Sequence, residues 1–308
     1  MIRLPYLNKE PLKEQVAWEE NGFYYEDSLQ PGKHPFHEAG VYYIQEASAM
    51  APAAICKRAD PDFVNSEDAG KIGTENDTEG QREKKSSDDF RFFGERILDL
   101  CAAPGGKSTQ MAAAMAGRGI LFSNEIHPAR ARILSENIER MGIVNDIVLN
   151  HDPKVLAERF PSYFHRILVD APCSGEGMFR RHPETRAEWT EQSPAGCAAR
   201  QKRILNSAWA MLRPGGRLVY STCTLNTEEN EGVINWMQQA FSDCETAAFT
   251  LPAGEGAELD APGGTLHLYP HRVKGEGHFV AFLRKRGDEP HASALAPGDA
   301  LAKPDKPL

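Results

Sequence analysis

The sequence predicts an α/β protein with a doubly wound, parallel sheet that is covered by helices on both faces. Short apolar runs typical of buried strands alternate with segments of helical periodicity between residues 96 and 285. The first of these runs ends in a glycine-rich turn that opens a helix. Folds with this alternation bind ligands beyond the carboxyl ends of their strands.

The expected elements follow one another at short intervals. Pro128 lies near the start of one expected helix and Gly142 just after it, and Thr227 is the expected N-cap of another. Strands are expected at 96–102, 119–126, 146–150, 166–172, 216–224 and 278–285. Helices are expected at 107–117, 127–142, 198–216 and 227–241, and a strand or turn followed by a helix at 41–59.

Composition divides the chain into three parts. Residues 1–45 form a short N-terminal segment, residues 46–286 the main domain, and residues 287–308 a disordered, linker-like tail rich in Pro, Ala and Asp. Within the main domain, residues 60–93 are polar and lack apolar periodicity, which predicts a disordered insertion. This insertion carries 10 acidic and 5 basic residues and so supplies −5 of the formal net charge of −9.

Charge and cysteine content limit the function classes. A net charge of −9 by itself argues against nucleic acid as a partner. The six cysteines form no C-x-x-C pair, so neither a metal site nor a disulfide framework is expected. With no apolar stretch long enough for a membrane span and no apolar signal core, we expect a cytoplasmic, monomeric protein with reduced thiols and no membrane partner.

The stretch LDLCAAPGGKSTQMAAAM, residues 98–115, decides which cofactor the fold would bind. Its G-K-S ending is typical of a triphosphate-binding loop, but Cys101 stands where that loop needs its first glycine. Glu125 lies about twenty residues further on, at the end of the next strand, where carboxylates accept hydrogen bonds from ribose hydroxyls. The G-x-G-x-x-G spacing of NAD sites is absent. The pattern favours S-adenosylmethionine, with a plain strand-to-helix turn as the alternative.

Further polar side chains follow the later strands. Asp152 comes just after the third strand. It is expected to bind the cofactor, to be the N-cap of a helix that begins at Pro153, or to do both. The fourth strand leads into D-A-P-C-S-G, with Asp170 and Cys173, and the fifth into S-T-C-T, with Cys223. Neighbouring strands bring these loops to one crevice, so one carboxylate and two thiols would face the cofactor's methyl group.

Four long motifs resemble the Sun/Fmu family of RNA cytosine-5 methyltransferases, and within it the bacterial RsmF-like branch that acts on 16S ribosomal RNA. They are LDLCAAPGGKS, VDAPCSGEGMFRR, STCTLNTEENEGVI and YPHRVKGEGHFVAFLRK, and the similarity covers about residues 33–286 apart from the insertion. The resemblance implies a Rossmann-like, class I S-adenosylmethionine-dependent methyltransferase fold. Relatives carry more chain at both ends, so residues 1–45 are interpreted as a reduced RNA-binding region.

The resemblance also implies a role for each site residue. Cys223 would be the nucleophile that adds to C6 of the cytosine, and Cys173 would assist release of the product. Asp170 would hold the N3/N4 edge of the base and lie beside the cofactor, and Lys107 is a candidate for activating the thiol. The residues that would bind S-adenosylmethionine are Cys101, Ala102, Ala103, Pro104, Gly105, Gly106, Lys107, Glu125, Asp152 and Asp170.

An RNA substrate needs local positive charge, which the chain offers in three clusters. The MFRRHPETR segment directly follows Cys173 and is expected to contact phosphates. The ARQKR cluster is interpreted as a solvated helix face, and PHRVK is a third candidate. The basic residues are Arg180, Arg181, His182, Arg186, Arg200, Lys202, Arg203, His271, Arg272 and Lys274.

Other functions remain compatible with the motifs. A transfer-RNA cytosine-5 methyltransferase would share them. A non-catalytic RNA-binding factor of ribosome assembly could keep the same fold, although both cysteines and the whole cofactor loop are present. A triphosphatase is the least favoured function.

Overall fold

The computed structural model describes residues 14–58, 92, 94–254 and 257–287. The predicted insertion and tail lie outside the described residues, apart from Phe92 and Gly287. Phe92 is 1% exposed and packs under the guanidinium of Arg166, 5.1 Å from its ring centroid. This position therefore belongs to the core.

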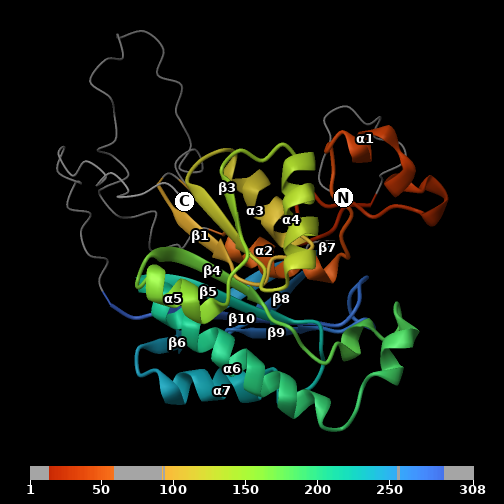
Figure 1. The fold of residues 1–308 in the computed structure, drawn as a ribbon. Helices are drawn as coiled ribbons and strands as arrows, with labels where there is room; N and C mark the ends of the chain where they lie inside the picture. The colour runs from red at the N-terminus through yellow and green to blue at the C-terminus, as the bar shows by residue number, and fades with distance from the viewer. Residues whose placement is uncertain (1–13, 59–91, 93, 255–256, 288–308) are drawn as a thin grey trace, which may run out of the picture.

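A central sheet organises the molecule (Figure 1). Its order is β3-β2-β1-β4-β5-β10-β6, and β9 also pairs with β10. The strands are β1 (Arg96–Asp99), β2 (Ile120–Asn124), β3 (Asp146–Leu149), β4 (Phe164–Asp170), β5 (Leu212–Thr222), β6 (Cys244–Thr246), β9 (Thr265–Leu268) and β10 (His278–Lys285). A separate antiparallel hairpin consists of β7 (Phe249–Gly254) and β8 (Ala257–Ala261).

The predicted doubly wound fold is confirmed, with one difference in strand direction. The five strands β1 to β5 are parallel, whereas β10 runs antiparallel to β5, to β6 and to β9. The strands between residues 244 and 268 were not predicted, because short, half-exposed strands give little periodicity. The strand order reverses at β1, which pairs with both β2 and β4, and this reversal makes the carboxyl ends of β1 and β4 the expected ligand crevice.

Helices cover both faces of the sheet (Figure 1). The helices α5, α6 and α7 lie on one face, and α2, α3 and α4 lie on the other. Their bounds are α1 (Pro35–Glu38), α2 (Ala51–Cys56), α3 (Gly106–Met115), α4 (Pro128–Arg140), α5 (Pro153–Arg159), α6 (Ser193–Met211) and α7 (Glu231–Ala240). Short 3-10 helices occur at Asp27–Leu29, Pro31–Lys33, Ser48–Met50, Glu176–Met178 and Pro183–Ala187.

Successive side chains of β4 point to opposite faces of the sheet and so pack into two different apolar clusters. Ile167 and Val169 enter the apolar cluster on the α6 side, and Leu168 enters the cluster on the α2 side. All three side chains are fully buried. A strand that is buried on both faces has a continuous apolar sequence, and for this reason the run ILV at 167–169 predicted the strand.

Two predicted helix boundaries were wrong. The helix expected at 198–216 begins at Ser193 and ends at Met211, because Leu212 already pairs with Phe164 as part of β5. Thr227 is not the N-cap of the last helix, which begins at Glu231 after Asn230. Residues 227–230 instead make a turn that buries Glu229 beneath the fourth strand's loop, as described below.

Candidate active site

The loop between β1 and α3 carries the predicted cofactor-binding residues. The amide of Ala102 donates to the carbonyl of Asn124 at 2.8 Å, and the amide of Gly105 donates to Ala102 at 2.8 Å. Gly105 has φ of +113°, a left-handed conformation that disfavours other residues. A Cβ at Gly106 would lie 3.1 Å from Gln45, so the segment before α2 packs closely against this loop. The sequence motif therefore folds as a tight turn whose backbone lies at the end of β1.

A carboxylate that the sequence interpretation overlooked anchors this turn. Asp99, at the end of β1, is 1% exposed and accepts a 2.7 Å hydrogen bond from the hydroxyl of Ser108 in α3. Burial raises the pKa of Asp99 to about 7, although Ser108 and Lys107 oppose the shift. The aspartate directly before the glycine-rich loop was the available sequence signal.

Glu125 and Asp152 stand at the ends of neighbouring strands β2 and β3. Glu125 is 3% exposed; one carboxylate oxygen accepts from the amide of His127 at 2.9 Å and the other lies 3.3 Å from Arg130. Asp152 is exposed and caps α5 by accepting from the amide of Lys154 at 2.8 Å. Both carboxylates thus face the same end of the sheet as the glycine-rich loop, and the N-cap alternative for Asp152 is realised.

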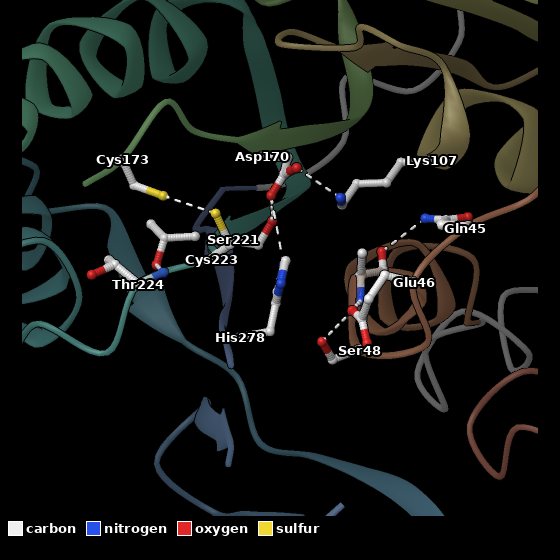
Figure 2. Close-up of polar contacts among 12 residues, drawn as sticks. Gln45, Glu46, Ser48, Lys107, Asp170, Cys173, Ser221, Cys223, Thr224 and His278 are labelled. Carbon is white, nitrogen blue, oxygen red and sulfur yellow. Dashed lines mark hydrogen bonds and ion pairs between the residues drawn. The ribbon is translucent and has the colours of Figure 1, made fainter. Parts of the chain in front are cut away.

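Asp170, at the end of β4, is the centre of the polar network in Figure 2. One oxygen lies 2.7 Å from the ammonium of Lys107. The other accepts a 2.7 Å hydrogen bond from the hydroxyl of Ser221 and lies 3.6 Å from Nε2 of His278. The Asp170 side chain keeps 29% of its surface exposed, so the carboxylate is held on several sides yet stays accessible.

These contacts fix the charge of the pair. Burial alone would raise the pKa of Asp170, but Lys107 and His278 outweigh it and hold the pKa well below its usual value. Burial alone would lower the pKa of Lys107, but Asp170 outweighs it and raises that pKa. Asp170 is therefore ionised and Lys107 protonated at neutral pH.

The two predicted cysteines meet beside this carboxylate. The sulfur atoms of Cys173 and Cys223 lie 3.3 Å apart and point toward each other (Figure 2). The hydrogen bond to Cys223 and burial raise the pKa of Cys173 well above its usual value. Either sulfur can be the donor in this contact. A thiol that donates to its neighbour stabilises negative charge on that neighbour.

The residues of this site fall within a known protein family. The family model described as 16S rRNA methyltransferase RsmB/F matches residues 93–284, which include Asp99, Asp170 and both cysteines. The chain belongs to this RsmB/F family. A second model, the N-terminal domain of 16S rRNA methyltransferase RsmF, matches residues 3–47.

Curated relatives agree with this RsmB/F assignment. The chain is 38% identical over 291 residues to proteins named ribosomal RNA small subunit methyltransferase F from Salmonella heidelberg and Salmonella enteritidis. Each alignment covers 92% of this chain and 53% of the relative. The chain thus spans about half the length of the curated relatives it matches.

Solved structures share the fold. A methyltransferase homologue from Pyrococcus horikoshii is 29% identical with a TM-score of 0.66, covering 88% of this chain and 77% of that one. The NSun6 protein from the same organism, solved with SFG, is 27% identical with a TM-score of 0.64, covering 83% of this chain and 56% of that one. Both support a class I methyltransferase fold for this RsmB/F chain.

A buried glutamate that sequence reasoning missed holds the Cys173 loop. Glu229 is fully buried and accepts from both the amide and the hydroxyl of Ser174, the residue after Cys173. It also accepts from the side-chain amide of Gln201 in α6 at 2.7 Å. Burial raises the pKa of Glu229, while the bonds from Ser174 and Gln201 oppose the shift. Its position in the polar run TEENE gave no signal of burial.

The basic segment after Cys173 is partly engaged within the protein. The guanidinium of Arg180 lies 3.0 Å from the carboxylate of Glu276 and also donates to the carbonyl of Gly275 at 3.1 Å. Arg181 and Arg186 are exposed. The prediction that this segment contacts phosphates thus applies best to Arg181 and Arg186, because Arg180 already holds the segment against the loop before β10.

The described residues contain no cluster of three or more histidine, cysteine or acidic side chains placed to hold a metal ion. No helix in the described ranges combines the length and apolarity that crossing a bilayer requires.

Proposed function

We propose that this chain transfers a methyl group from S-adenosylmethionine to C5 of a cytosine in 16S ribosomal RNA. The observation that carries the proposal is the pair of sulfur atoms 3.3 Å apart, next to an ionised carboxylate. The relatives named for methylation of small-subunit ribosomal RNA support the substrate. The RsmB/F family model supports the reaction class.

The chemistry of cytosine requires such a thiol. C5 of the ring is a weak nucleophile and does not attack a methyl sulfonium unaided. When a thiolate adds to C6, C5 becomes enamine-like and reacts. We assign Cys223 as the attacking group, the role that the resemblance to the Sun/Fmu family implies, and the thiol of Cys173 lies close enough to stabilise its thiolate.

The residues at the ends of β1, β2 and β3 fit the cofactor. Bound S-adenosylmethionine supplies an electrophilic methyl group. We assign the backbone of Cys101–Lys107 to the cofactor because its glycine turn allows close approach, and Glu125 and Asp152 to its ribose hydroxyls because their carboxylates accept hydrogen bonds. The neighbour NSun6 was solved with SFG, an analogue of S-adenosylmethionine, which supports this assignment.

Asp170 and Cys173 would act on the covalent adduct. The ionised Asp170 can accept hydrogen bonds from the N4 amino group and from a protonated N3, which stabilises the adduct. After methyl transfer, the C5 proton passes to a base and the bond between C6 and the sulfur of Cys223 breaks. Cys173 would donate its hydrogen bond to the departing thiolate, which is the expected role in product release.

Nucleoside mass spectrometry tests the proposal directly. Unmodified small-subunit RNA, free or assembled with its proteins, is incubated with the chain and isotopically labelled S-adenosylmethionine. Labelled 5-methylcytidine is expected. Labelled nucleosides of any other kind, or no labelled 5-methylcytidine while the cofactor binds, would contradict it.

A further inference from the structure

Three rings stack at the end of β9, outside the groups assigned to the reaction. The centroids of His267 and Tyr269 are 5.2 Å apart with an interplanar angle of 8°, and those of Tyr269 and His271 are 5.4 Å apart at 28°. His267 lies in β9 and His271 in the turn that follows, where the amide of Arg272 donates to the carbonyl of Tyr269 at 2.9 Å, and this turn brings the three rings into one stack. We call His267, Tyr269 and His271 the ring ladder.

The inner end of the ring ladder is fixed to the protein. His267 lies 2.6 Å from a carboxylate oxygen of Glu231, at the start of α7. Its ring also packs on the buried Phe279 at a centroid distance of 4.8 Å. A ring held by a hydrogen bond and by the core cannot turn freely, so the ladder is preorganised.

The outer end of the ring ladder faces solvent. His271 and Arg272 are exposed, and Tyr269 is partly buried. The guanidinium of Arg272 lies 5.9 Å from the Tyr269 ring centroid. Proteins that bind single-stranded nucleic acids combine an exposed ring, on which a base stacks, with a cation beside it.

The loop that carries the outer end of the ring ladder also contacts the cysteine site. The chain runs from His271 to Gly277, whose amide donates to the carbonyl of Gly177 at 3.3 Å. The amide of Gly177 in turn donates to the carbonyl of Cys223 at 2.9 Å. The blue segment after β9 accordingly lies beside the green segment between β4 and α6 (Figure 1). A strand whose reacting base lies at Cys223 would pass close to this ladder.

Other cations near the ladder are already engaged. Lys274 pairs with Glu14 and lies 4.4 Å from the ring of Tyr24. Arg180 pairs with Glu276. The exposed His271 and Arg272 are therefore the groups on this loop best placed to meet a ligand.

We propose that the ring ladder binds an unpaired base of single-stranded RNA by stacking it on His271, with Arg272 on the adjoining phosphate. The inference rests on the proposed function, because it places this base next to the cytosine that reacts. An enzyme that acts on a base must hold it out of the stack, and a platform for its neighbour stabilises the opened strand. Stacking tolerates any base, so this contact adds affinity without sequence choice.

Binding of defined RNA strands tests the ring ladder without requiring methylation. The probes are a fluorescent single-stranded oligouridine of about 12 nucleotides and a strand of equal length in which the bases are replaced by abasic sites. Fluorescence anisotropy gives Kd for the unaltered chain, His271→Ala and His271→Phe. Arg132→Ala, on the exposed face of α4, is the control for loss of a remote cation.

His271→Ala should weaken binding of the oligouridine by about 5- to 100-fold and leave binding of the abasic strand unchanged. His271→Phe should bind the oligouridine as the unaltered chain does, because a phenyl ring also stacks. Equal losses on both strands, no loss in His271→Ala, or no binding of oligouridine at all would overturn the proposal. If 5-methylcytidine forms but His271→Ala binds oligouridine as the unaltered chain does, the ring-ladder proposal is wrong and the proposed function stands. If binding depends on the bases but no 5-methylcytidine forms, the proposed function is wrong and the ring-ladder proposal stands.

Discussion

The two halves of the candidate site are built from contacts of different range. In the cofactor half, at the ends of β1 to β3, most partners are close in sequence, as with Asp99 and Ser108, nine residues apart. In the cysteine half, at the ends of β4 and β5, the partners are distant, as with Cys173 and Cys223, fifty residues apart. The first half thus depends mainly on contacts within or between successive strand–helix units, whereas the second exists only once the sheet and α6 are assembled.

The same division sets the charge of two aspartates at neighbouring strand ends. Asp99 meets the neutral hydroxyl of Ser108, and burial raises its pKa to about 7. Asp170 also meets burial, but Lys107 and His278 reverse the effect and lower its pKa. A cation in direct contact, rather than burial alone, decides which carboxylate remains ionised.

The largest expected effect is on the cysteine half. Cys223→Ala should reduce methyl transfer by at least roughly 10³-fold, because it removes the group assigned to form the bond to C6. Cofactor affinity, measured by calorimetry, should stay unchanged because Cys223 is not among the residues assigned to the cofactor. Cys173→Ala should instead trap a protein–RNA adduct that survives denaturation. Cys197→Ala, in α6, is the control, and an adduct found only with Cys223→Ala would exchange the two roles.

Removal of the buried glutamate should weaken the same half. Glu229→Ala leaves the amide and hydroxyl of Ser174 and the amide of Gln201 without their acceptor, at about 1–3 kcal/mol for each group. Glu229→Gln keeps an acceptor oxygen and should cost less. Urea unfolding measures both, with the exposed neighbour variant Glu228→Ala as control. Equal stability of Glu229→Ala and Glu228→Ala would show that long-range contacts do not hold this half.

The pH dependence of stability should reveal the raised pKa of Asp99 in the cofactor half. Its folded value of about 7 lies above the usual 3.8, so its protonated form is favoured on folding. The stability that Asp99 contributes is complete below about pH 4 and is lost as the pH rises through 7. Between about pH 5 and pH 8 the unaltered chain should lose about 2–3 kcal/mol relative to Asp99→Asn.

Urea unfolding at both pH values measures this difference. Ser108→Ala removes a bond that lowers the pKa of Asp99, so the loss of stability should extend to higher pH. Parallel pH profiles for the unaltered chain and Asp99→Asn would contradict the assignment.

The smallest effect is expected at Asp152, where two roles can be separated. Asp152→Ala removes the cap of α5 and should destabilise the fold by about 1 kcal/mol. Asp152→Asn keeps a capping oxygen but loses the charge, so stability should be retained while affinity for S-adenosylmethionine falls. Urea unfolding and calorimetry distinguish the two. Unchanged cofactor affinity in both variants would limit Asp152 to its capping role.

Several site residues were predictable because they follow a strand in the sequence. Asp170 and Cys173 come just after an apolar run, so their meeting with the loop after β5 follows from the sheet alone. Glu229 and His278 were not predictable as site residues, since one lies in an acidic run and the other begins an antiparallel strand. Nothing local distinguishes a buried glutamate from a solvated one.

The amino-acid sequence by itself determined the doubly wound fold, the glycine-rich turn and the identity of the two thiols, because periodicity and turn chemistry act over a few residues. Only the tertiary structure decided which aspartate remains charged and which basic residues are already paired. Those outcomes depend on burial and on charges brought from distant segments, such as Lys107 beside Asp170 and Arg180 beside Glu276.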